Sequence, residues 1–188
     1  MGKQINDRFS NILLAQNIIP EDGRSRIQEW LNEDGIPIQE RQLKEQQIGH
    51  VVFLLESIQP PMPAISIYST IRHPDRIIIH GGVNLSPEHI RMFNNDWDQN
   101  RRNILLLDLQ NRLTVLDVRH ELVHQDNQFS GISINLLIMN DELTKGKLLY
   151  SFFRIQEITN TMRNIMSMNL GTGIQQQRIN DNTPDFIR

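Results

Sequence analysis

The chain has 188 residues, a length that suggests one domain with a core of its own and no need of metal or disulfide staples. It contains no cysteine, which excludes structural disulfides and thiolate metal sites, and its formal charge of −3 gives no electrostatic case for nucleic-acid binding as the main task. No apolar run is long enough to cross a bilayer, and residues 1–10 lack the apolar stretch of a secretory signal, so we expect a cytoplasmic protein with no membrane partner.

The N-terminal half is expected to contain one amphipathic helix followed by several short strands. Residues 1–23 show no clear pattern and are treated as an N-terminal extension. From Arg24 to Glu33, apolar residues spaced i, i+3 and i+4 predict a helix that stops before Gly35. Alternating or continuous apolar residues then predict strands at 36–38, 50–56, 64–71 and 76–80. Turns are expected at 73–75 and at Gly81-Gly82.

Two helices are predicted to separate these strands from a second group. Ser86 can cap a helix that starts at Pro87 and ends near Phe93, and another helix begins near Asp96. The second group consists of two strands, at 115–124 and 131–139.

The last helix is the clearest element of the sequence. Apolar residues recur on one face from Lys145 to Met168, and Gly171 follows as a stop. Residues 171–188 are polar and rich in Asn and Gln, so we expect a flexible tail. The pattern as a whole predicts a single α+β domain over residues 24–170, with an antiparallel sheet packed against helices and a long C-terminal helix.

One short motif suggests catalysis. His120, Glu121 and His124 satisfy the zinc-hydrolase pattern H-E-x-x-H, in which two imidazoles on one helix face bind Zn²⁺ and the glutamate activates a metal-bound water. The third ligand would be Glu142 or Glu157, because these are the only downstream glutamates and no histidine follows the motif.

The residues around this motif favour a strand instead of a helix. Valine occurs at 115, 118 and 123, and apolar and charged residues alternate from Leu116 to Leu122. On a strand, residues four apart lie about 13 Å from each other, at about 3.3 Å per residue, so both imidazoles could not reach one metal. We therefore expect no catalytic residue, no metal and no cofactor. The alternative hypothesis is a zinc-dependent hydrolase that uses residues 120–124.

The remaining candidates for binding residues are isolated. His80 is expected at a strand end, where binding residues occur, while His73 is interpreted as a turn residue and His89 as part of an exposed helix face. Arg101 and Arg102 raise the hypothesis of a nucleic-acid site. The negative net charge and the absence of aromatic residues interleaved with basic ones argue against nucleic acid as a partner.

Four segments carry a family resemblance. They are Ile27 to Gly35 (IQEWLNEDG), Arg76 to Ile79 (RIII), Val83 to His89 (VNLSPEH) and Asn140 to Lys145 (NDELTK). In these segments, and over roughly residues 24–170, the chain resembles an uncharacterised, mainly archaeal family of small cytosolic proteins. The architecture of that family is similar to the type III secretion chaperone-like fold, an antiparallel sheet packed on helices.

The resemblance implies this fold and a tendency to form homodimers, and it implies no enzyme activity and no catalytic residue. Proteins of the wider fold often bind extended segments of client proteins. We therefore expect a non-catalytic, chaperone-like binding module that self-associates and takes a protein client. The N-terminal extension and the tail are departures from the family pattern.

Overall fold

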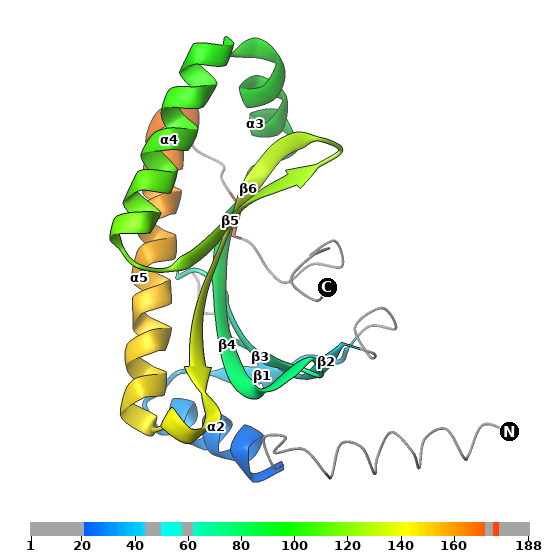
Figure 1. Cartoon of the computed structure of the whole chain (residues 1–188), viewed down its shortest axis with the longest axis vertical. Helices are drawn as coiled ribbons and strands as arrows, with labels where there is room; N and C mark the ends of the chain where they lie inside the picture. Colours follow the sequence, from blue (N-terminus) through cyan, green and yellow to red (C-terminus); the bar gives the residue numbers. More distant parts are fainter. Residues whose placement is uncertain (1–20, 44–49, 58–61, 172–174, 177–188) are drawn as a thin grey trace, which may run out of the picture.

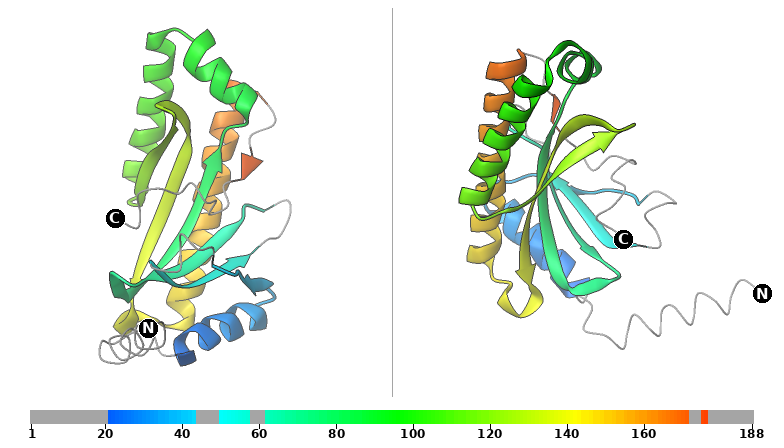
Figure 2. Two further views of the ribbon diagram at one scale, coloured as in Figure 1. Left: turned by 90° about the vertical axis from the view of Figure 1, so that its right-hand side faces the viewer. Right: turned by 45° about the horizontal axis from the view of Figure 1, so that its top comes forward.

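The structure is a computed structural model, and it describes residues 21–43, 50–57, 62–171 and 175–176. The predicted α+β architecture is confirmed: an antiparallel sheet packs against helices, and the chain has a long C-terminal helix (Figures 1 and 2). Predictions for residues 1–20, 172–174 and 177–188 lie outside the described residues, and residues 175–176 of the predicted tail form a short strand.

The described helices come before, between and after the strands. They are α2 (Glu21–Glu33), α3 (Pro87–Arg91), a π-helical turn η1 (Met92–Asp96), α4 (Gln99–Val115), a short 3-10 turn η2 (Asn140–Glu142) and α5 (Lys145–Leu170). The predicted cap is present, because the Ser86 hydroxyl accepts the N–H of His89 at 3.4 Å. None of the helices in this part of the chain combines the length and the apolar character needed to cross a bilayer.

The described strands form one sheet. They are β1 (Ile38–Glu40), β2 (Val51–Ser57), β3 (Ile65–Thr70), β4 (His73–Asn84), β5 (Arg119–Gln125), β6 (Gln128–Met139) and β7 (Gln175–Gln176). The strand order is β1-β2-β3-β4-β6-β5, and β7 pairs with the end of β4. The two predicted groups of strands are therefore joined, because β4 of the first group pairs with β6 of the second.

Several predicted boundaries are wrong. The strand expected at 115–124 begins only at Arg119, because α4 continues to Val115. Burial of Leu109 and Leu113 against the sheet extends the helix past the point where β-branched residues favour a strand. Residues 73–75 belong to β4, and the turn lies just before them. The strand expected at 36–38 is found at 38–40, after Ile36, which is buried in the core.

The two glycines at 81 and 82 do not end a strand, contrary to expectation, and β4 runs through them to Asn84. Gly81 faces α5 at very close range. A Cβ atom added there would lie 2.5 Å from the Thr159 hydroxyl oxygen and 2.7 Å from Cγ2 of Ile155. Gly81 therefore lets the sheet and the helix approach each other, and it acts as a packing residue instead of a terminator.

The core lies between the helices and one face of the sheet. Along β4, Ile77, Ile79 and Val83 point into this core, whereas Ile78 packs in a separate small cluster on the other side. Figure 1 shows α4 and α5 along one side of the sheet, and Figure 2 shows the same sheet from its opposite side. No described helix covers that opposite side, which carries Ile78 and His80, and we call it the open face.

Candidate functional site

The two motif histidines lie on β5, an edge strand, where their sequence context places them. Nδ1 of His120 is 3.1 Å from the carbonyl oxygen of Val118, and Nδ1 of His124 is 3.0 Å from that of Leu122. Leu122 lies within β5 and Val118 directly precedes it, so each imidazole contacts a backbone carbonyl of its own extended segment. The helix on which the zinc hypothesis depends is absent from this segment, so the two imidazoles do not share a helical face.

The two residues considered as a third ligand are each paired with a basic residue of their own segment. Glu142, in η2, is paired with the ammonium of Lys147, and Glu157, on α5, lies 3.4 Å from a guanidinium nitrogen of Arg154. Glu121 is exposed on β5. Within the described ranges, no group of three or more histidine and carboxylate side chains is arranged to hold a metal ion.

The basic pair at the start of α4 is engaged in contacts within the chain. The guanidinium of Arg101 lies 3.7 Å from the ring centroid of Trp97. Arg102 donates to the carbonyl oxygen of Asn94 at 2.6 Å and to the side chain of Gln99 at 2.8 Å. These contacts join α4 to the preceding turn, so they give the pair a structural role and add no support for a nucleic-acid site.

Two other histidines are placed differently from their predictions. His89 is buried instead of exposed, and its Nδ1 lies 2.8 Å from the Ser86 hydroxyl. His80 lies in the interior of β4 instead of at its end, and only 1% of it is exposed. A signal for His80 was available in the sequence. It stands two residues after Ile78, so the period of a strand puts it on the same face of the sheet.

His80 belongs to a line of polar residues that crosses the open face, which we call the polar row. The register pairs His80 with Ser66 on β3 and with Asn135 on β6. The row continues to Glu56 on β2 and to Arg119 on β5. Each member comes from a different strand, so no spacing along the sequence could have indicated the row.

The imidazole of His80 is neutral and has one unused nitrogen. Its Nδ1 lies 3.0 Å from the amide oxygen of Asn135 and 3.3 Å from the hydroxyl of Ser133. An amide oxygen only accepts, so Nδ1 carries the hydrogen and Nε2 is an acceptor, which has no partner among the described residues. Burial lowers the pKa of His80 to about 4, because the charged ring would lose its hydration, while the bond to Asn135 acts in the opposite direction.

An apolar cluster lies next to the polar row. Val51, Leu54 and Tyr68 are buried together, with Leu43 and Ile78 packed against them, and this cluster is separate from the main core. Burial raises the pKa of the Tyr68 phenol, since the phenolate would be poorly hydrated there. This side of the sheet therefore combines a buried apolar cluster with a line of mostly buried hydrogen-bonding groups.

A cavity of about 590 Å³ opens on this face, where β3, β4, β6 and β5 meet. Its lining combines four apolar or aromatic residues with three charged and three other polar ones, among them two residues of the zinc motif: Tyr68, Ile78, Val118 and Leu137; Arg76, Arg119 and Glu121; His73, His120 and Asn135. A second cavity of about 310 Å³ adjoins it beside Asp117 and Leu136. Ligand sites are typically concave and combine apolar residues with polar groups that orient the ligand.

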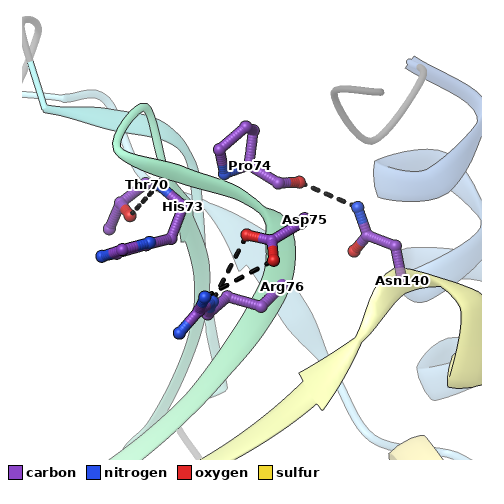
Figure 3. A network of polar contacts seen from close by, with 6 residues as sticks. All are labelled: Thr70, His73, Pro74, Asp75, Arg76 and Asn140. Atoms are coloured by element: carbon purple, nitrogen blue, oxygen red, sulfur yellow. Dashed lines mark hydrogen bonds and ion pairs between the residues drawn. The ribbon is translucent and has the colours of Figure 1, made fainter. Parts of the chain in front are cut away.

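Polar contacts link the start of β4 to the turn that follows β6 (Figure 3), next to His73 and Arg76, which line the larger cavity. The Asn140 amide donates to the carbonyl oxygen of Pro74 at 2.8 Å, which ties the two strands together at this end. The guanidinium of Arg76 lies 3.3 Å and 3.4 Å from the two carboxylate oxygens of Asp75 and lowers the pKa of that carboxyl through these hydrogen bonds.

The fold and part of the sequence have known counterparts. The structure is similar to a crystal structure of an uncharacterized protein from Methanothermobacter thermautotrophicus, with a TM-score of 0.67 and 20% sequence identity, over 79% of this chain and 99% of that chain. At this identity the similarity concerns the fold alone. No curated protein matches the chain. A family profile matches residues 24–168, so the chain belongs to the family described as "Uncharacterized conserved protein (DUF2299)".

Proposed function

We propose that this protein is a non-catalytic, chaperone-like binding module of the cytoplasm that holds an extended segment of a client polypeptide against the open face of its sheet. The observation that carries the proposal is the composition of that face. It joins an apolar cluster, a cavity of about 590 Å³ and a polar row, and no described helix lies over it.

A polypeptide segment matches both parts of this surface. Its apolar side chains can bury against Tyr68, Ile78 and Leu137, which gains roughly 25 cal/mol for each Å² of apolar area removed from water. Its backbone C=O groups can accept hydrogen bonds from the guanidinium groups of Arg76 and Arg119, which line the cavity. The charged residues at the cavity have both signs, so the surface does not select a strongly charged ligand.

The zinc hydrolase remains the alternative function, and the geometry of β5 favours it less. Its two histidines lie on an extended strand, and the fold similarity to the archaeal structure adds nothing on catalysis.

Peptide binding is expected to depend on Leu137. A peptide selected from a random library by panning on the full-length protein should bind the wild type and bind Leu137→Arg about tenfold or more weakly, because the arginine places a charge in the apolar lining. Isothermal titration calorimetry measures both affinities, and far-UV circular dichroism confirms that the variant is folded.

The matched control is Tyr150→Arg, which adds the same charge on the helix side of the molecule, at a tyrosine of α5 that is 69% exposed. It should leave the affinity unchanged. The proposal fails if panning yields no binding peptide, or if both variants weaken binding equally.

We also propose that two copies of the chain associate through the outer side of α4. This helix is apolar on both sides: Leu105, Leu109 and Leu113 are buried, while Ile104, Leu107 and Val115 are 63%, 56% and 84% exposed. A helix of that kind is usually buried on all sides. The resemblance to a dimerising fold makes a second copy the partner that we propose.

Self-association is expected to weaken about tenfold or more in Leu107→Glu, because a carboxylate would then lie within an apolar interface. Sedimentation equilibrium over a concentration series measures the dimer constant. Asn164→Glu, which adds the same charge on an exposed position of α5, should behave as the wild type. A wild type that stays monomeric throughout the series would exclude this interface.

A further inference from the structure

β5 covers only part of β6. The pairing of the two strands stops at Arg119 and Asn135, although β6 continues to Met139. Beyond that point β6 is paired with β4 alone, as far as Arg76. Residues 136–139 therefore form a short sheet edge in line with β5, visible beside the lower part of β6 in the left view of Figure 2. We call this edge the notch.

The register shows which backbone groups face the notch. The N–H of Leu85 donates to the carbonyl oxygen of Ser130 at 2.8 Å, so at this residue of β6 the backbone groups point toward β4. The direction of the backbone N–H and C=O groups alternates from one residue to the next along a strand, and the β4–β6 register shows no shift. The N–H and C=O groups of Leu136 and Ile138 therefore also form hydrogen bonds with β4. Leu137 turns its N–H and C=O groups toward the notch, and Met139 turns its N–H there, where β5 supplies no partner. The C=O of Met139 belongs to the start of the 3-10 turn η2.

Both ends of the notch are bounded by the fold. At one end lie Val118 and Arg119, where the chain enters β5, and at the other the Asn140 amide holds the carbonyl of Pro74. Leu137 lines both cavities, of about 590 and 310 Å³. The notch is therefore a short unpaired stretch of sheet edge with a boundary at each end. A single extended chain can pair with it, whereas an edge strand of a folded domain would collide with the turn before β5.

We propose that the client segment adds to the sheet as a short strand beside β6, pairing with the backbone of Leu137 and Met139 and continuing the line of β5. Strand addition rests on the proposed function and specifies how the client segment binds. Backbone hydrogen bonds supply affinity with little dependence on sequence, as in other cases of strand addition. The side chain opposite Leu137 falls on the open face beside Leu137, at the end of the row that Leu137 forms with Ile78 and Tyr68, which selects an aromatic or branched aliphatic residue there.

Amide hydrogen exchange tests the arrangement directly. In the free full-length protein the amides of Leu136 and Ile138 should exchange slowly, because they bond to β4, and those of Leu137 and Met139 should exchange quickly. Addition of the panned peptide should slow exchange at Leu137 and Met139 about tenfold or more, and leave Leu136 and Ile138 unchanged. Equal protection at all four amides in the free protein would overturn the notch itself.

A proline at the notch tests the hydrogen bond that the N–H of Met139 is proposed to donate to the client segment. Met139 has φ −71°, which matches the ring of proline, so Met139→Pro should fold normally while it removes one N–H donor of the notch. Peptide affinity should fall about tenfold in this variant. Met139→Ala, which keeps the N–H and removes the side chain, should stay within about twofold of the wild type.

The outcomes separate this inference from the proposed function. If the peptide binds and depends on Leu137, but Met139→Pro binds it normally and the two amides are not protected, the open face binds polypeptide without strand addition. If the proline and alanine variants lose affinity equally, the side chain of Met139 is responsible and strand addition is again overturned. If no peptide binds the wild type, both proposals fail.

Discussion

Gly81→Ala is expected to destabilise the protein by about 3 kcal/mol, near the upper end of what overpacking of a core costs. The added methyl group would lie 2.5 Å from the Thr159 hydroxyl and 2.7 Å from Cγ2 of Ile155, and real Cβ atoms do not approach other atoms so closely. Both contacts are with α5, so the sheet and its main helix would have to separate. Urea unfolding followed by circular dichroism measures the change.

A second substitution on α5 should relieve part of this strain. Thr159 is buried, and its hydroxyl has no partner among the described residues, so Thr159→Ala removes the nearest obstacle and breaks no described hydrogen bond. The double variant should recover roughly half of the lost stability, because the contact with Ile155 remains. Gly146→Ala is the control, since no atom lies within 4 Å of its added Cβ. If Gly81→Ala unfolds no more easily than Gly146→Ala, α5 does not pack closely on β4 at Gly81.

Acidification from about pH 7.5 to about pH 5 is expected to cost about 2 kcal/mol of folding stability through His80 alone. The pKa of His80 is lowered from 6.5 to about 4 in the folded protein because the ring is buried. Between these two values the unfolded chain binds a proton that the folded chain excludes. The contribution of neutral His80 to folding stability is therefore fully present above the pKa that this histidine has in the unfolded chain. It is lost as the pH falls toward the pKa of His80 in the folded protein.

The comparison with His80→Gln isolates this effect. The difference in unfolding free energy between wild type and variant, measured by urea unfolding at both pH values, should shift by about 2 kcal/mol in favour of the variant on acidification. Ser69→Ala, at a buried polar residue that does not titrate, should keep the pH dependence of the wild type. An identical pH dependence in wild type and His80→Gln would mean that His80 is hydrated in the folded protein.

The polar row is an unusual choice for a sheet that needs stability alone. A histidine at this buried position requires hydrogen bonds, and one of its nitrogens has no partner among the described residues. An apolar residue would pack there without that cost. Local departures from the rules of folding are concentrated at functional sites, which is why the polar row supports the placement of the proposed binding surface.

The sequence by itself determined the elements whose signals are local. The apolar stripe from Lys145 predicts α5, which extends two residues beyond the predicted Met168 to Leu170, and Ser86 with Pro87 marks the start of α3. Alternation around His120 is enough to predict an extended strand, and an extended strand by itself disfavours the zinc hypothesis. In each case the pattern lies within a few residues of the chain, where helix and strand periods are directly visible.

The tertiary structure decided everything that depends on pairing between distant segments. Gly81 looks like a strand terminator until α5 is seen to lie against it, and Val115 looks like a strand residue until α4 is packed on the sheet. The polar row and the notch exist only through the registers of β4, β6 and β5. A register joins residues far apart in the sequence, and a slip of one residue would turn every side chain to the other face, so neither feature leaves a local pattern.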